Sequence, residues 1–563
     1  MLMRKNRLAV LGILLFTILM IAPFIIIGQL GVHSDWSFHA ARVQQIFLNL
    51  KRGHFITYIA TDTFSKVGNA NFLFYPIVFL YPWALLKFIF APIIAYLIYI
   101  WIILLATGLI AFFCMQHFTK GKTLQSFFFS IIYLIAPYHL YLTFSNYVLG
   151  EAIAYSFIPI VLLGIYNFWK EDKWILLAVG LTLMAYSHYV SLFISVELCL
   201  IVSICFIIQN QKITYSQVKN LGKAIVLFLV LSLWQFIPLF TDYLGENLSK
   251  PASGFYLVQN AGDFIVSAIS NEALNKGGIG LLLVVTLFIG WRFVDKNSSY
   301  TWIYFLGALF TWIITTAFPW QYFSKTPLSI VQFPYRYTSY AIVFLAMILS
   351  KMLANINKIN KTKYLSSLGI ILMMLLLYAG SVYPDLARNA RIDKRIPILI
   401  NSCTGNYKTF RDPNDSPIII DNDNYNKQFS YGALFGETDY IPQKAVDNNK
   451  SVFNRQTYIN GKKAELHQQT FANKILYNVK VTTKKSVIDI PQLSYRHTRV
   501  KVDGKNYAYG ISNRGTILLS LNRGAHTIEI SYHPSLMLTI FRIVAVIGWL
   551  GILINYSYRR LVK

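Results

Sequence analysis

Long apolar segments recur along the chain, and short polar stretches separate them. Runs of about eighteen or more apolar residues are typical of helices that cross a membrane. Hydropathy alone predicts spans at 8–28, 72–90, 92–117, 123–142, 151–169, 173–187, 189–208, 221–240, 278–294, 300–318, 333–350, 364–383 and 537–556. Basic runs at both ends of the chain favour cytoplasmic termini, which require an even number of crossings. We therefore expect about twelve spans, with about fourteen as the alternative.

The pattern changes between Pro384 and His533, where polar and apolar residues alternate with a period of two. This alternation predicts β-strands, and glycine-containing pairs predict the turns between them. The clearest strands are Lys474–Val481, Thr516–Leu521 and His526–Tyr532, and the turns are Asp503–Gly504 and Arg523–Gly524. The fold class that follows is a polytopic α-helical membrane protein with a β-sandwich inserted before the last span.

The predicted organisation has three parts. A transmembrane domain covers residues 1–383 and includes a first outer loop at 29–71, a β-rich domain covers 384–536, and a last helix with a basic tail covers 537–563. The basic segment Lys351–Lys363 should be cytoplasmic, so the β-rich domain beyond the next span should be extracytoplasmic. The first apolar segment lacks a small-residue cleavage site and is interpreted as a span, not as a signal peptide.

Composition and charge narrow the class of protein. Hydrophobic residues make up 55% of the chain and charged residues 13%, which excludes an ordinary soluble domain. The net charge of +27 would suggest nucleic acid in a soluble protein, but here much of it lies in short loops that set orientation. We therefore expect membrane lipid and no nucleic acid as a partner. Residues 384–536 hold 22 Lys and Arg against 13 Asp and Glu, so this part should attract anionic lipid or polymer.

The four cysteines predict neither a disulfide framework nor a metal cluster. Three lie in apolar segments, and the fourth stands alone in the β-rich part: Cys114, Cys199, Cys205 and Cys403.

The stretch after the first span carries the most distinctive polar pattern. Ser34 or Asp35 can cap a helix that runs to about residue 50. In such a helix, Asp35, His39 and Arg42 lie one above another on a single face. A second, apolar face is formed by Trp36, Val43, Phe47 and Leu50. The pattern predicts a helix at the membrane surface with its polar side toward a cavity.

A set of short motifs resembles a known family. The set comprises Asp35, Phe38-His39, Arg42, Phe74-Tyr75-Pro76, Gly150-Glu151-Ala152, Pro159, His188 and Gln332-Phe-Pro-Tyr-Arg336. It resembles the bacterial membrane proteins called "6-pyruvoyl-tetrahydropterin synthase related", which are similar in turn to YfhO-like proteins and to the GT-C glycosyltransferase superfamily. The chain departs from the pattern at Leu149, where that family often has Arg, which puts a phosphate contact there in doubt. The synthase activity in the label is not expected, because it needs a zinc site of clustered histidines and the ten histidines here are scattered.

The resemblance implies a bacterial cell-membrane enzyme that moves a sugar from a polyprenyl-phosphate donor to a cell-envelope polymer on the outer face. It implies that an acid in the first outer loop orients the acceptor hydroxyl, and Asp35 is the candidate. The alternative for Asp35 is a simple helix cap. Arg42 and Arg336 are the candidates for the donor phosphate, because a guanidinium offers a fork of donors to phosphate oxygens. Gln332 would add a polar contact, and a snorkelling anchor is the alternative for Arg336.

Three further substrate-binding candidates are ionisable groups within or at the ends of spans, where burial is costly: His39, Glu151 and His188. Glu151 could instead be a first-turn acid on the helix dipole, and His188 a hydrogen-bonded structural residue. No cofactor is certain and no metal ligand is assigned. A divalent cation is possible near Asp35, with contributions from His33, Asp62, Asp242 and Asp263, although their spacing does not require one.

Two other functions compete with the enzyme. The second hypothesis is a transporter or flippase for a lipid-linked sugar, which would also need a charged cavity, and the third is a non-catalytic envelope-assembly protein. A transporter usually shows inverted repeats and broken helices near mid-membrane. The polar set here falls in predicted outer loops, which favours the enzyme.

Overall fold

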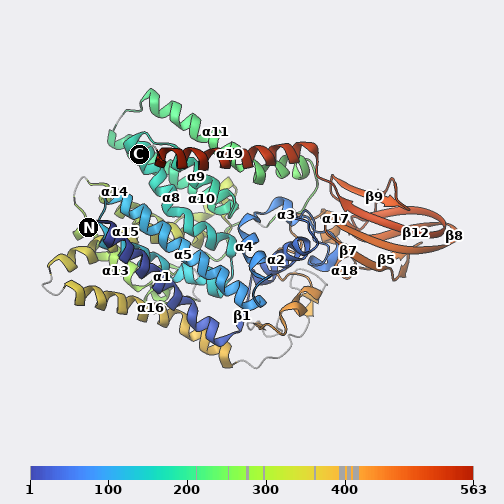
Figure 1. Ribbon diagram of the computed structural model, residues 1–563, viewed down its shortest axis with the longest axis horizontal. Helices are drawn as coiled ribbons and strands as arrows, with labels where there is room; N and C mark the ends of the chain where they lie inside the picture. Colours follow the sequence, from blue (N-terminus) through green and yellow to red (C-terminus); the bar gives the residue numbers. More distant parts are fainter. Residues whose placement is uncertain are drawn as a thin grey trace. The chain divides into compact units, whose positions relative to one another are not determined.

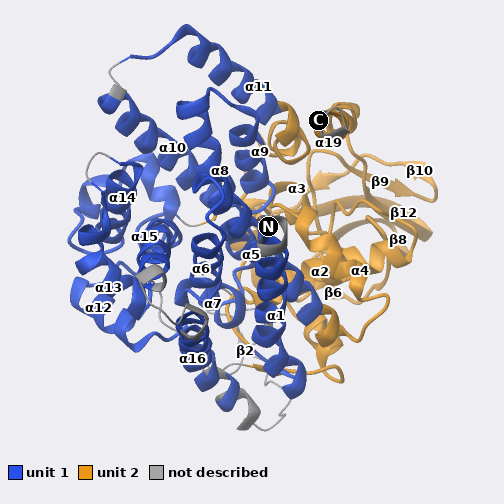
Figure 2. Ribbon diagram, turned by 60° about the vertical axis from the view of Figure 1, so that its left-hand side comes forward, with its two compact units in different colours: residues 1–31, 96–229, 252–393 blue, residues 32–95, 230–251, 394–563 orange. Residues whose placement is uncertain are grey.

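The computed structural model describes residues 2–210, 212–251, 253–273, 278–295, 298–359, 363–391, 400–401, 408–409 and 418–561. Cys403 and most of the predicted start of the β-rich domain lie outside these residues. The chain forms two compact units, coloured separately in Figure 2. Unit 1 holds residues 1–31, 96–229 and 252–393, and unit 2 holds residues 32–95, 230–251 and 394–563. Each unit is therefore assembled from segments that are distant in sequence.

Unit 1 is a helical bundle (Figure 1). Its principal helices, two of which extend into unit 2 at one end, are α1 (Leu2–Ile27), α5 (Pro92–Phe118), α6 (Thr123–Leu134), α7 (Pro137–Leu140), α8 (Leu149–Glu171), α9 (Ile175–Ala185), α10 (Tyr189–Asn210), α11 (Tyr215–Pro238), α12 (Ala261–Ser270), α13 (Leu281–Ile289), α14 (Ser299–Ile313), α15 (Thr338–Ile359) and α16 (Lys363–Arg391). Small residues allow close packing: a Cβ at Gly164 of α8 would lie 2.7 Å from the backbone of Leu177 of α9.

Among the described residues, eight helices are long and apolar enough to cross a membrane. They are Asn6–Ile27, Pro92–Phe118, Leu149–Glu171, Tyr189–Gln209, Tyr215–Tyr243, Pro334–Ile356, Ser366–Pro384 and Leu536–Tyr558. The pair Thr123–Leu134 and Pro137–Ser145, bent by 49°, would make a ninth.

This number is smaller than the expected twelve to fourteen spans, and proline accounts for part of the difference. The predicted span 72–90 is divided among α3 (Asn71–Phe74), the 3₁₀ turn η2 (Val78–Leu80) and α4 (Tyr81–Leu86). Pro76 lies at the break between α3 and η2, where a missing N–H and a fixed φ interrupt a continuous helix, and Pro82 lies in the first turn of α4, where proline starts a new helix. The predicted span 173–187 is the 11-residue helix α9.

Unit 2 combines short helices, one long helix and a β-sheet. The helices are α2 (Trp36–Lys51), α3, α4, α17 (Gln443–Asp447), α18 (Asn449–Phe453) and α19 (Leu536–Leu561). The strands of the large sheet are β5 (Thr457–Ile459), β6 (Lys462–Ala464), β7 (His467–Phe471), β8 (Lys474–Leu493), β9 (Thr498–Val502), β10 (Lys505–Asn506), β11 (Gly510–Ile511) and β12 (Thr516–Tyr532). Two small separate sheets are formed by β2 (Ile400–Asn401) with β3 (Lys408–Thr409), and by β4 (Ile418–Ile420) with β1 (Leu30–Val32), of which Val32 alone belongs to unit 2.

The large sheet is antiparallel, with the order β10-β9-β12-β8-β5-β6, and β8 and β12 run side by side in Figure 1. All eight strands belong to one sheet, in place of the two sheets of the predicted sandwich. The predicted turn Asp503–Gly504 is confirmed between β9 and β10, where both residues have positive φ. The predicted turn Arg523–Gly524 is wrong: β12 continues through it with a register shift, which the unusual φ of Gly524 accommodates.

An apolar core unites the segments of unit 2. Residues from all three stretches of chain contribute buried side chains to it, including Phe74, Ile237, Leu248, Tyr495 and Leu538. The first outer loop, the end of α11, the β-sheet and α19 therefore fold as one body, which the chain order does not reveal.

Candidate functional site

The predicted helix after the first span exists as α2, and Asp35 stands at its N-cap position. Its surroundings differ from the expectation of an interfacial helix with one face toward a cavity. Residues on both faces are buried, from Trp36 to Ile46 with the exception of Ser37. The indole N–H of Trp36 donates to Gln428, which lies far along the chain, at 2.9 Å. Helix α2 is enclosed because segments of unit 2 cover its polar stripe as well as its apolar one.

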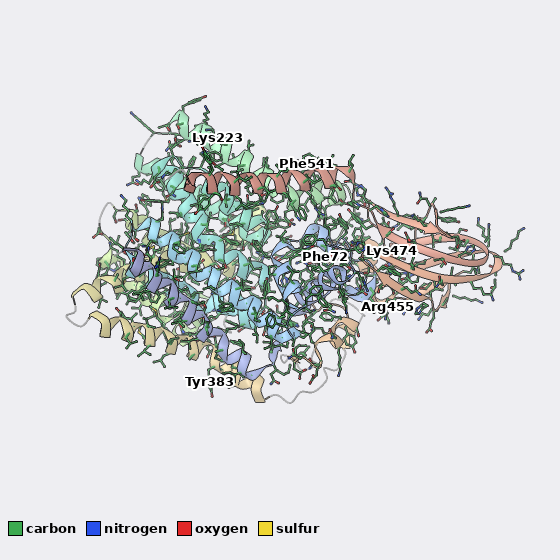
Figure 3. All side chains as sticks on the ribbon, viewed as in Figure 1. Phe72, Lys223, Tyr383, Arg455, Lys474 and Phe541 are labelled. Carbon is green, nitrogen blue, oxygen red and sulfur yellow. The ribbon has the colours of Figure 1, made fainter. Side chains whose placement is uncertain are left out.

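The guanidinium of Arg42 is fully buried and binds backbone oxygens of its own unit. Its Nη2 donates to the carbonyls of Tyr75 at 2.9 Å and Pro76 at 2.7 Å. The aromatic rings of Phe38, Tyr75 and Phe72 surround it at 4.8–5.9 Å, and Phe72 is labelled in Figure 3. Arg42 thereby ties α2 to the Tyr75–Pro76 segment through its Nη2 atom.

His39 lies one turn before Arg42 and is 2% exposed. Burial, and then the positive charge of Arg42, hold the pKa of this imidazole well below its usual value. His39 is therefore neutral at pH 7. Its Nδ1 has no hydrogen-bond partner within the described parts of the chain.

Asp35 is half-buried, and its side chain makes no capping bond to α2. The Ser34 hydroxyl lies 3.4 Å from Oδ1, while the Asp35 carbonyl accepts the His39 amide at 3.1 Å. Asp35 therefore occupies the N-cap position without a side-chain capping bond, and its role in the reaction stays a prediction.

A loop from the C-terminal part of unit 2 covers the first turn of α2. The amide of Leu434 donates to the Ser37 hydroxyl at 2.8 Å, and Gly436 approaches Phe38 so closely that a Cβ would lie 2.6 Å from its ring. Glu437 in this loop is 1% exposed and accepts from the Ser65 hydroxyl at 2.7 Å. Burial raises its pKa to about 7. Sequence reasoning missed this acid, because its surroundings come from distant segments.

Arg336 and Glu151 form a buried ion pair in unit 1. The Nε of Arg336 lies 3.3 Å from Oε2 of Glu151, and the Tyr138 hydroxyl donates to Oε1 at 2.5 Å. Nη1 of Arg336 donates to the side-chain oxygen of Gln332 and to the Val331 carbonyl, both at 2.8 Å. The structure therefore brings three predicted substrate-binding residues together as mutual partners. The positive charge of Arg336 is compensated by Glu151 within the protein.

His188 lies between α9 and α10 and is 4% exposed. Its Nδ1 is 2.9 Å from the Ser191 hydroxyl, close to the start of α10. This contact matches the structural interpretation of the residue.

The predicted site residues thus fall into two groups. Asp35, His39 and Arg42 lie in unit 2, whereas the other four, Glu151, His188, Gln332 and Arg336, lie in unit 1. The convergence of Asp35, Arg42 and Arg336 on one outward-facing cavity, which the predicted reaction would need, stays a prediction.

Arg542 is a candidate that sequence reasoning missed. It lies on α19, next to the labelled Phe541 of Figure 3, and is 5% exposed. Its guanidinium carbon is 4.8 Å from the ring of Trp234 and 5.5 Å from that of Tyr58. Nε and Nη1 have no hydrogen-bond partner among the residues that the structure describes. The sequence did contain a signal for this residue, because an arginine inside an apolar span is unusual and suggests a function.

Asp242 lies near this arginine, and its partners are other residues. It is fully buried and accepts from the Tyr532 hydroxyl and from His497 Nδ1, both at 2.7 Å. Asp62, another predicted contributor to a cation site, is held by Arg52 at 2.6 and 3.0 Å. In the described part of the chain, no group of three or more His, Cys, Asp or Glu residues is arranged to hold a metal ion.

The fold and the buried ionisable groups define a polytopic α-helical membrane protein with an antiparallel β-sheet domain. Residues 72–384, more than half of the chain, match the 6-pyruvoyl-tetrahydropterin synthase related domain of membrane proteins, and the chain belongs to this family. The match includes the Glu151, His188, Gln332 and Arg336 motifs, whereas Asp35 and Arg42 precede it. A comparison with curated proteins gives no match. The likeness to YfhO-like and GT-C proteins stays a prediction from the motifs.

Proposed function

We propose that the protein is a membrane glycosyltransferase that moves a sugar from a polyprenyl-phosphate donor to a cell-envelope polymer at the outer face. In this reaction the acceptor hydroxyl forms a bond to the anomeric carbon, and the bond from that carbon to the phosphate oxygen breaks. Polyprenyl phosphate leaves as an anion, and the hydroxyl proton passes to a carboxylate or to water. Such a reaction needs a group that orients the hydroxyl and a cation that receives the phosphate.

The observation that carries the proposal is the guanidinium of Arg542. A buried cation with two nitrogens unsatisfied by the described residues is costly, and an anionic ligand would lower that cost. The arginines of the sequence prediction, in contrast, already have polar partners. Arg42 already donates to two carbonyls, and Arg336 is paired with Glu151. We therefore assign the donor phosphate to Arg542.

Asp35 remains the proposed acceptor-orienting carboxylate. It shares unit 2 with Arg542, is half-buried, and makes no capping bond to α2. The loop of Leu434 and Gly436 covers the same helical turn, so an acceptor bound there would meet residues from both ends of the chain.

The test measures transfer from a radiolabelled polyprenyl-phosphate sugar into envelope polymer, in membranes that contain the full chain. We expect Asp35→Asn and Arg542→Gln each to reduce transfer by at least about 100-fold, as loss of a catalytic group typically does. Asp447→Asn is the matched control, because Asp447 is an exposed acid at the end of α17 in the same unit and has no assigned role. Unchanged transfer by Asp35→Asn, with normal folding and amount of protein, would remove Asp35 from the mechanism.

Measurements on the same membranes also distinguish a glycosyltransferase from a transporter or flippase. A flippase would move the lipid-linked sugar across sealed vesicles without forming labelled polymer, and an assembly protein would do neither. Either result in the unmodified protein would overturn the proposal.

A further inference from the structure

Unit 1 contains an apolar pocket that the proposed function does not use. Its cavity volume is about 90 Å³, which suits a narrow chain and not a bulky ligand. Helices α5, α6, α8, α10, α14 and α15 supply its lining, which is almost entirely hydrocarbon and aromatic. Four of these helices are candidate spans, so the pocket lies among segments suited to a bilayer.

The pocket lies toward one end of this bundle. Phe118 and Gln209 line it from the last turns of α5 and α10, and Ser299 and Trp302 line it from the first turn of α14. Half-buried and exposed residues, both aromatic and polar, thus gather at the rim, while Phe129 and Phe344 line the pocket deeper in the bundle and are buried. This gradient suits a molecule with an apolar tail and a polar head.

Basic residues surround the rim. The ammonium group of Lys170 lies 5.1 Å from the centre of the Phe206 ring, which lines the pocket. Lys120 and Lys122 are exposed in the turn that follows α5. None of these three lysines forms an ion pair with any residue that the structure describes. The acids Glu171 and Asp295 at this end pair with other lysines, at 2.6 and 2.5 Å.

We propose that this pocket binds one acyl chain of an anionic phospholipid, whose phosphate lies against Lys170 and the lysines of the 120–122 turn. The apolar lining excludes a polar ligand, because a buried group without hydrogen bonds is costly there. The positive rim selects an anionic head over a zwitterionic one. The site is independent of the proposed sugar transfer, since it uses none of the residues assigned to that reaction.

The test uses the full chain, purified in detergent, and phospholipids with brominated acyl chains, which quench nearby tryptophan fluorescence. The component due to Trp302 is the difference between the unmodified protein and Trp302→Phe. We expect brominated phosphatidylglycerol to quench this component at a lower mole fraction than brominated phosphatidylcholine. Lys170→Gln should reduce the preference for phosphatidylglycerol by about fivefold, whereas Lys480→Gln on the β-sheet should leave it unchanged.

A second variant blocks the pocket itself. Cys205 lines it and is 9% exposed, so Cys205→Phe should fill the space and abolish quenching of Trp302 by either lipid. Equal quenching by the two lipids in the unmodified protein would show that a neutral lipid serves as well, and would overturn the proposal. Absence of any Trp302 component would also overturn it. If Cys205→Phe does not fold, the lipid comparison and Lys170→Gln still decide the question.

Discussion

At the scale of single residues, several charged side chains are buried away from water, and most of them have partners within the protein. The guanidinium of Arg42 contacts backbone carbonyls and aromatic rings, and the guanidinium of Arg336 pairs with the carboxylate of Glu151. Removing one partner of a buried pair leaves an uncompensated charge, which costs far more than the net contribution of the pair. These residues can therefore be essential for folding whether or not they contact substrate.

The Glu151–Arg336 pair can be tested by a double-mutant cycle. We expect Glu151→Gln and Arg336→Met each to lower the unfolding free energy by about 3–5 kcal/mol, because each leaves one buried charge alone. The double variant should lose much less than the sum of the two, since no buried charge remains. Thermal unfolding in detergent measures all three variants.

The matched control for this cycle is Glu171→Gln, which breaks an ion pair whose side chains are 68% and 38% exposed. An exposed pair contributes little, so the unfolding temperature should stay nearly unchanged. Additive losses in the Glu151–Arg336 cycle would show that the two charges do not compensate each other.

Glu437 predicts a pH dependence of stability. Its folded pKa of about 7 lies above the ordinary value of 4.5, so the folded chain holds this proton more tightly than the unfolded chain. The contribution of Glu437 to stability is therefore greatest at low pH and falls as the pH rises from about 4.5 to 7, by about 3 kcal/mol. Glu437→Gln, which mimics the protonated acid and can keep both hydrogen bonds, should lack this fall. Unfolding of both proteins at pH 5 and 8 in detergent gives the difference, and equal slopes would contradict it.

At the scale of elements, tight turns join segments that are distant in sequence. The residues Phe64, Ser65 and Lys66 all have positive φ, and the turn that they form brings the Ser65 hydroxyl to Glu437. Such backbone is strained for residues with a side chain, so the contacts around it must compensate for its cost. The loop at Gly436 is held against α2 by a similar close approach.

Gly436→Ala tests this approach, with Gly461→Ala as the control. The two glycines have φ of +72° and +77°, so alanine incurs a similar backbone cost at both. At Gly436 the new Cβ would also overlap the Phe38 ring, whereas nothing lies within 4 Å of it at Gly461. We expect Gly436→Ala to lower the unfolding free energy by about 1–3 kcal/mol more than Gly461→Ala. Equal losses would show that the loop moves away from α2 without cost.

At the scale of the whole molecule, the two compact units do not correspond to two consecutive parts of the sequence. The first outer loop, the segment 230–251 and the C-terminal part fold together as unit 2. If the β-sheet is extracytoplasmic, as the basic loops predict, the other loops of this unit should be reachable from the same side. This expectation is about the side of the membrane that these loops face.

Cysteine labelling tests the orientation. In a chain whose Cys403 is replaced by serine, we expect Lys480→Cys on β8 to react with a membrane-impermeant maleimide in intact cells. Lys219→Cys on α11, in a predicted cytoplasmic segment, should react only after the membrane is opened. Both positions are exposed, so access to the reagent decides the result. The reverse pattern would invert the predicted topology.

The sequence by itself determined the class of protein, the helix α2, the main strands β8 and β12 and the turn at Asp503–Gly504. These features follow from local periodicity and from the backbone preferences of a few residues, which neighbours along the chain express directly. The tertiary structure decided which charges have partners: the carbonyls around Arg42, the carboxylate beside Arg336, and the aromatic rings around Arg542. Whether a buried cation has hydrogen-bond or ion-pair partners depends on groups that are tens to hundreds of residues away in the sequence. A short sequence motif does not show how close those groups lie in the folded protein.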